Sequence, residues 1–277
     1  MSLHTFNNFT SDLKTTSEKM PVLFIGHGSP MNGIQDNQFS QTWAQLGKAI
    51  TRPTAVLVIS AHWLTHGTHV TAMEHPRTIH DFGGFPQELF NVQYPAPGSP
   101  QLAEEVSQII TSAPVGLDEH EWGLDHGTWT VVRHMYPDAD IPVLQLSIDY
   151  NKSPQYHYDL AKQLASLRQK GVLIIGSGNM IHNLRMVDWQ RLNEPNYGFD
   201  WAVELNQVFK QKIGDHNHAD LIAYNNLGAA AKLAIPTPDH YYPLLYTLGL
   251  QESKDDIRFF NDELVGGSLN MTGVKIG

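Results

Sequence analysis

Four short apolar segments constrain the fold of this 277-residue chain more than any other feature of its sequence. They cover residues 22–25, 55–59, 142–148 and 171–175 and consist largely of Val, Ile and Leu. Uninterrupted runs of this kind are typical of strands buried on both faces, as in a parallel sheet. Amphipathic segments separate the runs, so strand and helix alternate. The sequence therefore predicts an α/β fold with a central, mostly parallel sheet flanked by helices.

The predicted helices have recognisable starts and apolar faces. Residues 39–49 and 199–213 show helical spacing, and residues 127–135 predict a shorter helix. Two more helices are expected to open at Ser99-Pro100 and Ser153-Pro154, because Ser followed by Pro suits the first positions of a helix.

The end of the chain predicts a different pairing. Residues 257–261 and 272–276 are strand-like and flank Gly266-Gly267, which indicates an antiparallel hairpin, placed at the sheet edge. No repeat or Pro/Gly/Ser-rich linker divides the chain. We therefore expect a polar N-terminal arm over residues 1–20 and one catalytic domain over residues 21–277.

The composition excludes several classes of function. The absence of cysteine rules out disulfide frameworks, Cys-type zinc sites, iron–sulfur clusters and thiol nucleophiles. The 18 Lys and Arg against 28 Asp and Glu argue against nucleic acid as a partner, because phosphate binding needs clustered cations. No apolar run approaches the roughly 20 residues that span a bilayer, and residues 1–20 lack the apolar core of a secretory signal. We expect a cytoplasmic protein without membrane or nucleic acid partners.

Histidines follow three of the four predicted strands. His27, His62 and His182 come after the first, second and fourth apolar runs. Ligands in open α/β sheets bind at the carboxyl ends of strands, so these side chains are expected at one rim. Glycines beside His27 and before His182 permit tight turns and close backbone approach. His126 and His240 precede predicted helix starts, at positions untypical of a core.

The histidine pattern alone leaves two interpretations open. Histidine is the commonest metal ligand and the usual acid or base near neutral pH, which favours a metal site. Surface or packing histidines explain the same pattern equally well, because no short ligand motif supports the long spacings. Nucleotide fingerprints and serine-hydrolase elbows are absent around Gly176-Ser177-Gly178 and Ser29. The remaining histidines are interpreted as surface, loop-packing or contextless residues: His4, His66, His69, His75, His80, His120, His134, His157, His216 and His218.

Six segments, in order, resemble the class III extradiol ring-cleavage dioxygenases, and specifically the DOPA-type branch of bacteria and betalain-making plants. The resemblance runs from about Pro21 to the C-terminus. The matching segments are residues 26–30, 60–63, 78–86 with 94–98, 124–129, 176–178 with 182–185, and 239–244.

The resemblance implies one non-haem divalent metal. His27 and His62 match two of the family's ligands, and His240 falls at the third, where the wider class III group has a carboxylate. Three imidazoles suit Zn(II) as well as Fe(II). His182 matches an active-site histidine that acts as an acid/base or a fourth ligand, and His126 matches a helper on the substrate side.

Candidate substrate contacts are less directly implied. Trp63 and Tyr241 are aromatic rings that could stack on a substrate, with core packing as the alternative. Asp125 flanks His126, where it either contacts the site or is solvated at the surface.

The resemblance implies cleavage of a small catechol such as DOPA by O₂ to a muconic semialdehyde. Fe(II) is expected for activity and Zn(II) in recombinant protein, where it would give no dioxygenase activity because zinc lacks redox chemistry. Two alternatives stay open: a zinc-dependent hydrolase, and a non-catalytic metal-binding or interaction protein of the Memo-like type. The oligomeric state is not predicted.

Overall fold

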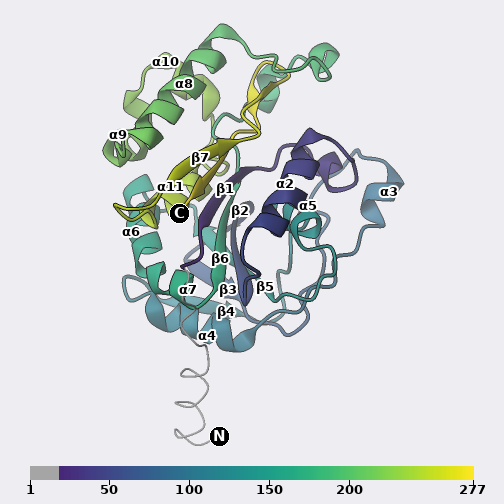
Figure 1. The fold of residues 1–277 in the computed structure, drawn as a ribbon, viewed down its shortest axis with the longest axis vertical. Coiled ribbons are helices and arrows are strands. Elements are labelled where there is room, and N and C mark those ends of the chain that lie inside the picture. Colours follow the sequence, from purple (N-terminus) through teal and green to yellow (C-terminus); the bar gives the residue numbers. More distant parts are fainter. Residues whose placement is uncertain (1–18) are drawn as a thin grey trace, which may run out of the picture.

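A sheet of eight strands, in the order β4-β3-β5-β2-β6-β1-β10-β7, runs through the centre of the molecule (Figure 1). The computed structural model describes residues 19–277. The middle of the sheet is parallel and consists of β1 (Val22–Gly26), β2 (Ala55–Thr65), β5 (Val143–Asp149) and β6 (Val172–Gly178). These are the four predicted strands, and the predicted α/β fold class is confirmed.

One edge of the sheet holds two strands that the sequence did not predict. Strand β3 (Thr68–Thr71) pairs antiparallel with β5, and β4 (Val115–Asp118) pairs parallel with β3. Both segments are short and mix Thr, His, Gly and Asp with single apolar residues. They therefore lack the apolar run from which the other strands were predicted.

The opposite edge confirms the C-terminal antiparallel hairpin. Strand β10 (Gly273–Ile276) pairs with β1, and β7 (Ile257–Phe260) pairs with β10, both antiparallel. A second, two-stranded pair of β8 (Leu264–Val265) and β9 (Leu269–Asn270) lies between them in sequence. The glycines at 266 and 267 connect this inner pair, and both have positive φ angles of 56° and 84°.

Helices cover both faces of the sheet, with α2 and α5 on one side and α6, α7 and α11 on the other (Figure 1). Alternate side chains of β1 divide between the two cores, because Leu23 and Ile25 pack with the first group and Val22 and Phe24 with the second. The α-helices are α2 (Gln38–Ala49), α3 (Gln87–Phe90), α4 (Pro100–Ile109), α5 (His126–Met135), α6 (Pro154–Gln163), α7 (Ala165–Gln169), α8 (Asp200–Gly214), α9 (His218–Ile222), α10 (Ala229–Ala234) and α11 (Tyr242–Gly249). The 3₁₀ helices are η1 (Pro30–Gly33), η2 (Leu184–Met186), η3 (Trp189–Arg191) and η4 (Tyr224–Asn226). Among residues 19–277, no helix has both the length and the apolarity needed to cross a membrane.

The helix starts follow the predicted capping chemistry. The hydroxyls of Ser99 and Ser153 accept hydrogen bonds from Leu102 N and Tyr156 N, and each serine precedes a proline at the first helical position. Asp125 caps α5 by accepting from Thr128 N. These caps fix where α4, α5 and α6 begin.

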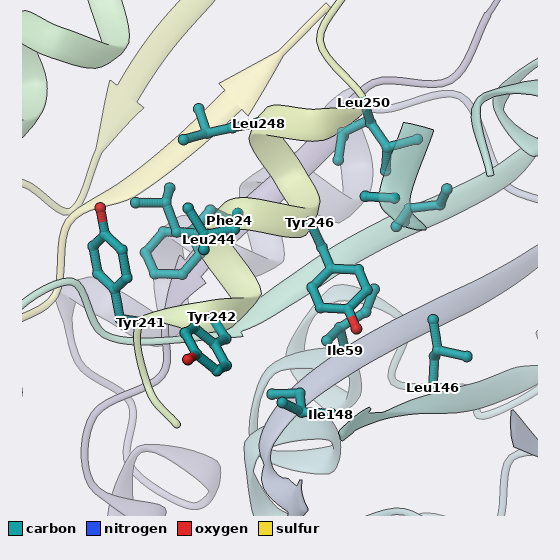
Figure 2. Packing of buried hydrophobic residues seen from close by; sticks show 14 of the residues in the cluster. Phe24, Ile59, Leu146, Ile148, Tyr241, Tyr242, Leu244, Tyr246, Leu248 and Leu250 are labelled. Atoms are coloured by element: carbon teal, nitrogen blue, oxygen red, sulfur yellow. The ribbon is translucent and has the colours of Figure 1, made fainter. Parts of the chain in front are cut away.

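Helix α11 is buried along its whole length and forms the centre of the larger core. Every residue from Tyr242 to Gly249 is buried. Figure 2 shows Leu244, Tyr246 and Leu248 of this helix near Phe24 of β1. A helix that is apolar all round has no amphipathic pattern, which explains why only its start was anticipated.

The start of the domain lies slightly earlier than expected. Met20 is 2% exposed, and its backbone N–H donates to Arg168 O at 3.0 Å. Lys19 forms ion pairs with Glu252 and Asp255. The last two residues of the predicted arm therefore pack on the domain, and residues 1–18 lie outside the described part of the chain.

His157, for which the sequence offered no context, is a core residue of α6 beneath α11. Its side chain is fully buried, with Nδ1 3.0 Å from Tyr246 Oη and the ring 4.4 Å from that of Tyr242. Nε2 has no hydrogen-bond partner within residues 19–277. Burial lowers the pKa of His157 to about 4.

This pKa shift predicts an acid-sensitive core. The folded state favours neutral His157, so below about pH 6.5 the unfolded chain binds more protons than the folded protein. The stability of the folded protein therefore decreases as the pH is lowered. We expect this residue alone to cost about 3 kcal/mol between pH 7 and pH 4. Urea unfolding of the wild type and of His157→Gln across this range measures the difference. Parallel stability curves for the two proteins would contradict the prediction.

Candidate metal centre

Three histidines converge at the carboxyl ends of the parallel strands. His27 directly follows β1, His62 lies on β2, and His240 lies just before α11. Each offers one ligand atom, and these three atoms lie within 4.8 Å of one another. The predicted meeting of His27 and His62 at one rim is what the structure shows, and His240 joins them.

Strand β2 positions His62 in a way that differs from the prediction. The strand does not end at residue 59 but continues to Thr65, with a register shift against β5 between Ile59 and Leu64. His62 therefore lies within the irregular part of a strand and not after it. Such irregularities commonly redirect side chains next to functional sites.

Glycine allows His240 to approach the end of β6. A Cβ on Gly178 would lie 2.2 Å from the backbone oxygen of His240, so no larger residue fits there. The neighbouring Asn179 N–H donates to the same oxygen at 2.9 Å. The close approach predicted for the glycine before His182 is therefore present, and it places His240 opposite His27.

The tautomer of His27 follows from its hydrogen bonds. Its Nδ1 lies 3.0 Å from Ser177 Oγ, and Ser177 Oγ donates its own proton to Gly127 O at 2.6 Å. The serine oxygen can therefore only accept from His27, which must carry its proton on Nδ1. This leaves a lone pair on His27 Nε2, which faces His62 Nε2 at 3.1 Å.

Carboxylates favour the same tautomer in the other two rings, through a hydrogen bond at His240 and an ion-pair contact at His62. His62 Nδ1 lies 3.3 Å from Asp81 Oδ2, and His240 Nδ1 donates to Asp239 Oδ2. Burial opposes ionisation of Asp239, but the hydrogen bond from His240 holds its pKa below the usual range. Hydrogen bonds of this kind commonly orient metal-binding histidines. All three Nε2 atoms are thus left with lone pairs for a ligand.

This donor set fits a divalent metal. A metal ion with bonds of about 2.0–2.1 Å to imidazole holds neighbouring ligand nitrogens roughly 3 Å apart, close to the His27–His62 separation. Burial and the neighbouring histidines hold the pKa of both rings well below the usual range, so a proton between them is disfavoured. Two lone pairs at this separation repel unless a cation lies between them. His27, His62 and His240 are the residues that would hold it.

His182 and His126 border the three candidate ligands from two sides. The His182 ring stacks on His240, with centroids 3.6 Å apart and planes at 7°. Burial, followed by the charge of His240, lowers the pKa of His182 to about 3. The His126 ring lies 3.9 Å from His62. His126 and His240 are 5% and 7% exposed, which corrects the expectation that neither position is buried.

Asp125 was expected to contact the substrate, but in the structure it contacts the protein scaffold. It is fully buried and accepts hydrogen bonds from Ser60 Oγ at 2.7 Å and Gln145 Nε2 at 2.6 Å, besides capping α5. Burial raises the pKa of its carboxyl group. Its acceptor sites are used by the scaffold, because it joins α5 to β2 and β5.

The two candidate stacking rings also lie in the core. Trp63 is 4% exposed and stacks on Trp122 with planes at 3°. Tyr241 is 1% exposed, and its hydroxyl donates to Leu221 O at 2.9 Å. The packing alternative given for both rings agrees with these positions, and substrate stacking does not.

Sequence reasoning assigned no role to Asp81 or Ser177. Ser177 occupies the end of β6, where it fixes His27, and Asp81 lies in an irregular segment before α3. Burial opposes ionisation of Asp81, but the hydrogen bond from His126 lowers its pKa. Both residues belong to segments that carry the family resemblance, which was the signal available to find them.

Comparison with known proteins agrees with this geometry. The family model described as the catalytic LigB subunit of aromatic ring-opening dioxygenase matches residues 21–270. A 4,5-DOPA dioxygenase extradiol from Escherichia coli K12 is 46% identical over 269 residues, which cover 96% of this chain and 98% of that protein. The protein of that name from Beta vulgaris is 34% identical, covering 92% and 95%. A crystal structure of an uncharacterized protein from Escherichia coli K12 superposes with a TM-score of 0.81 at 41% identity, covering 94% and 100% of the two chains.

Proposed function

Because the chain belongs to the class III extradiol dioxygenases that include the catalytic LigB subunit, and is an extradiol dioxygenase, we propose that its substrate is a small catechol such as DOPA. Cleavage of the carbon–carbon bond beside the diol, with both atoms of O₂ entering the product, gives a muconic semialdehyde. The names of the relatives from Escherichia coli and Beta vulgaris support this substrate. The hydrolase and Memo-like alternatives lack such support.

The convergence of the Nε2 lone pairs of His27, His62 and His240 carries the proposal. Bound Fe(II) would supply the redox chemistry that allows O₂ to react with a catechol, whereas Zn(II) has none. We propose Fe(II) as the active metal for this reason. Zinc binds His-rich sites well, so we also expect it in recombinant protein.

His182 and His126 are proposed to handle the protons of the catechol. A catechol must lose hydroxyl protons before the ring opens, and a general base has to lie within hydrogen-bond reach. His126 is anchored through Nδ1 to Asp81, which leaves Nε2 as an acceptor. His182 is neutral near pH 7, so one ring nitrogen has a lone pair for a hydroxyl proton, and its lowered pKa means that the protonated ring gives that proton up readily. Either ring can return that proton as the product forms.

Oxygen uptake tests the proposed function. The protein is stripped of metal, reloaded anaerobically with Fe(II), and mixed with DOPA in an oxygen electrode while the visible spectrum is recorded. We expect stoichiometric oxygen use and a yellow product, and no uptake from the zinc-loaded protein. His182→Ala should lower the rate by about 10²–10⁴-fold while one Fe(II) stays bound.

One outcome would sink the proposal. If protein that holds one Fe(II) consumes no oxygen with DOPA or with a panel of small catechols, the substrate class is wrong. If His182→Ala keeps the wild-type rate, the role proposed for His182 is wrong although the reaction stands.

A further inference from the structure

Asp81 connects the candidate metal ligands to His126 through a single carboxylate. Oδ1 accepts from the His126 backbone N–H at 2.9 Å, and Oδ2 lies 2.9 Å from His126 Nδ1. The same Oδ2 lies 3.3 Å from His62 Nδ1. One oxygen atom thus faces a ring nitrogen of a candidate ligand and a ring nitrogen of a candidate proton acceptor.

We propose that Asp81 is a positioning residue that sets the tautomers of His62 and His126 together. The inference rests on the proposed function for its catalytic part, because it assigns His62 to the metal and His126 to the substrate. A carboxylate can only accept hydrogen bonds, so the bond to His126 places that ring's proton on Nδ1, and the negative charge of Oδ2 at 3.3 Å favours a proton on His62 Nδ1 as well. Both Nε2 atoms then keep their lone pairs, one for the metal and one for a substrate proton.

The surroundings of Asp81 direct its charge toward these two rings. Its side chain is only 14% exposed, and within residues 19–277 its ion-pair partners are His62 and His126, with no Lys or Arg among them. The nearby Asp125 cannot replace it, because Ser60, Gln145 and the start of α5 occupy that carboxylate.

Neighbouring side chains hold the irregular segment that carries Asp81. On one side, His80 Nε2 lies 3.0 Å from Val92 O. On the other, the Phe82 ring packs edge-on against His126 at 5.5 Å and lies tilted against Phe90 at 5.1 Å. The carboxylate therefore sits on a fixed piece of backbone, as a positioning residue requires.

Asp81→Asn is the informative substitution because an amide cannot make the same three contacts. If its oxygen faces the two rings, its NH₂ group meets the His126 backbone N–H, donor against donor. If its oxygen faces that N–H, its NH₂ group meets both Nδ1 atoms and moves their protons to Nε2. The second arrangement removes the lone pair that His62 would offer to the metal.

Metal affinity is the first readout and does not depend on the reaction. Zn(II) and Co(II) are titrated into metal-free protein in competition with a chelator, and the Co(II) visible spectrum reports the ligand set. We expect Asp81→Asn to weaken both metals by about 10–100-fold, the usual cost of losing an outer hydrogen bond. Asp81→Glu retains an acceptor-only carboxylate and should recover part of the affinity. With Fe(II) and catechol, Asp81→Asn should lower kcat more than it raises KM.

Asp118 provides the matched control. It is also a largely buried carboxylate, 9% exposed, and accepts three backbone N–H bonds, from residues 120 to 122. Within the described residues, it forms no hydrogen bond or ion pair with His27, His62, His126, His182 or His240. Asp118→Asn should therefore keep the metal affinity and kcat of the wild type, even if it lowers the melting temperature.

A measurement on the wild type keeps the proposal testable if the variants do not fold. In zinc-loaded protein, ¹⁵N chemical shifts distinguish protonated from unprotonated ring nitrogens, and we expect Nδ1–H on both His62 and His126. A proton on Nε2 of His126, or wild-type metal affinity in folded Asp81→Asn, would overturn the proposal. So would a second bound metal per chain that Asp81→Asn loses, because Asp81 would then be a ligand. Failure of the wild type to consume O₂ would refute the proposed function and leave these metal and NMR results decisive for Asp81.

Discussion

The His240→Ala variant is expected to lose tight metal binding and ring-opening activity while it remains folded. His240 supplies one of three converging nitrogens, and its ring is oriented by Asp239. Loss of a direct ligand should cost more than the roughly 10–100-fold typical of losing an outer hydrogen-bond partner. The variant keeps the backbone oxygen that accepts from Asn179, so α11 should still begin at the same place.

Metal content and oxygen uptake check this expectation together. Chelator competition gives the affinity for Zn(II), and the oxygen electrode gives activity after anaerobic loading with Fe(II). His120→Ala is the matched control, because the His120 side chain is 84% exposed and far from the fold's interior. If His240→Ala bound metal as tightly as His120→Ala, a three-histidine centre at this rim would be ruled out.

Arg168→Met is expected to destabilise the folded protein by about 3–5 kcal/mol, the usual cost of removing one partner of a buried ion pair. Arg168 is fully buried and pairs with Asp255 at 2.7 Å. It also donates to Met20 O at 2.8 Å and Leu250 O at 2.7 Å. These bonds join the start of β1 to the end of α11, and Met leaves both the carboxylate and the carbonyls without this partner.

A surface ion pair of the same length isolates the effect of burial. Arg52 and Asp140 also approach to 2.7 Å, but their side chains are 59% and 53% exposed. Arg52→Met should change stability very little by comparison, because water screens and replaces the interaction. Equilibrium urea unfolding of both variants gives the comparison. If both variants lost the same free energy of unfolding, burial would not explain the contribution of Arg168 to stability.

The central strands could be predicted because burial on both faces forces a continuous apolar run, as in residues 171–175 of β6. Other elements lacked that requirement. The end of β2 carries Ser60 and His62 because it faces the site, so its polarity concealed the last six residues of the strand, 60–65. Helix α11 is apolar on all sides and has no period to detect. Sequence patterns therefore predict buried strands well but predict poorly where a strand or helix ends.

The site was predicted to the extent that parallel topology brings strand ends together. His27 and His62 follow from that rule, whereas the role of His240 as the third ligand came from the family resemblance alone. The rule does not reach Asp81, which lies on neither helix nor strand. It also does not separate core aromatics from exposed ones, which is why Tyr241 was a candidate although its ring is enclosed by Tyr224 and Phe209. The cytoplasmic location stays a prediction.

The three candidate ligands lie far apart in the sequence, and this has a consequence for the stability of the protein. His27 lies near the start of the described chain and His240 near its end, so one ion would tie together segments that are distant in sequence. An ion that binds only the folded state adds about 4 kcal/mol of stability when its free concentration is a thousand times its Kd. Metal binding would then control both the catalytic activity of the protein and its resistance to unfolding and proteolysis. In a cell short of metal, the chain would become not only inactive but also shorter-lived.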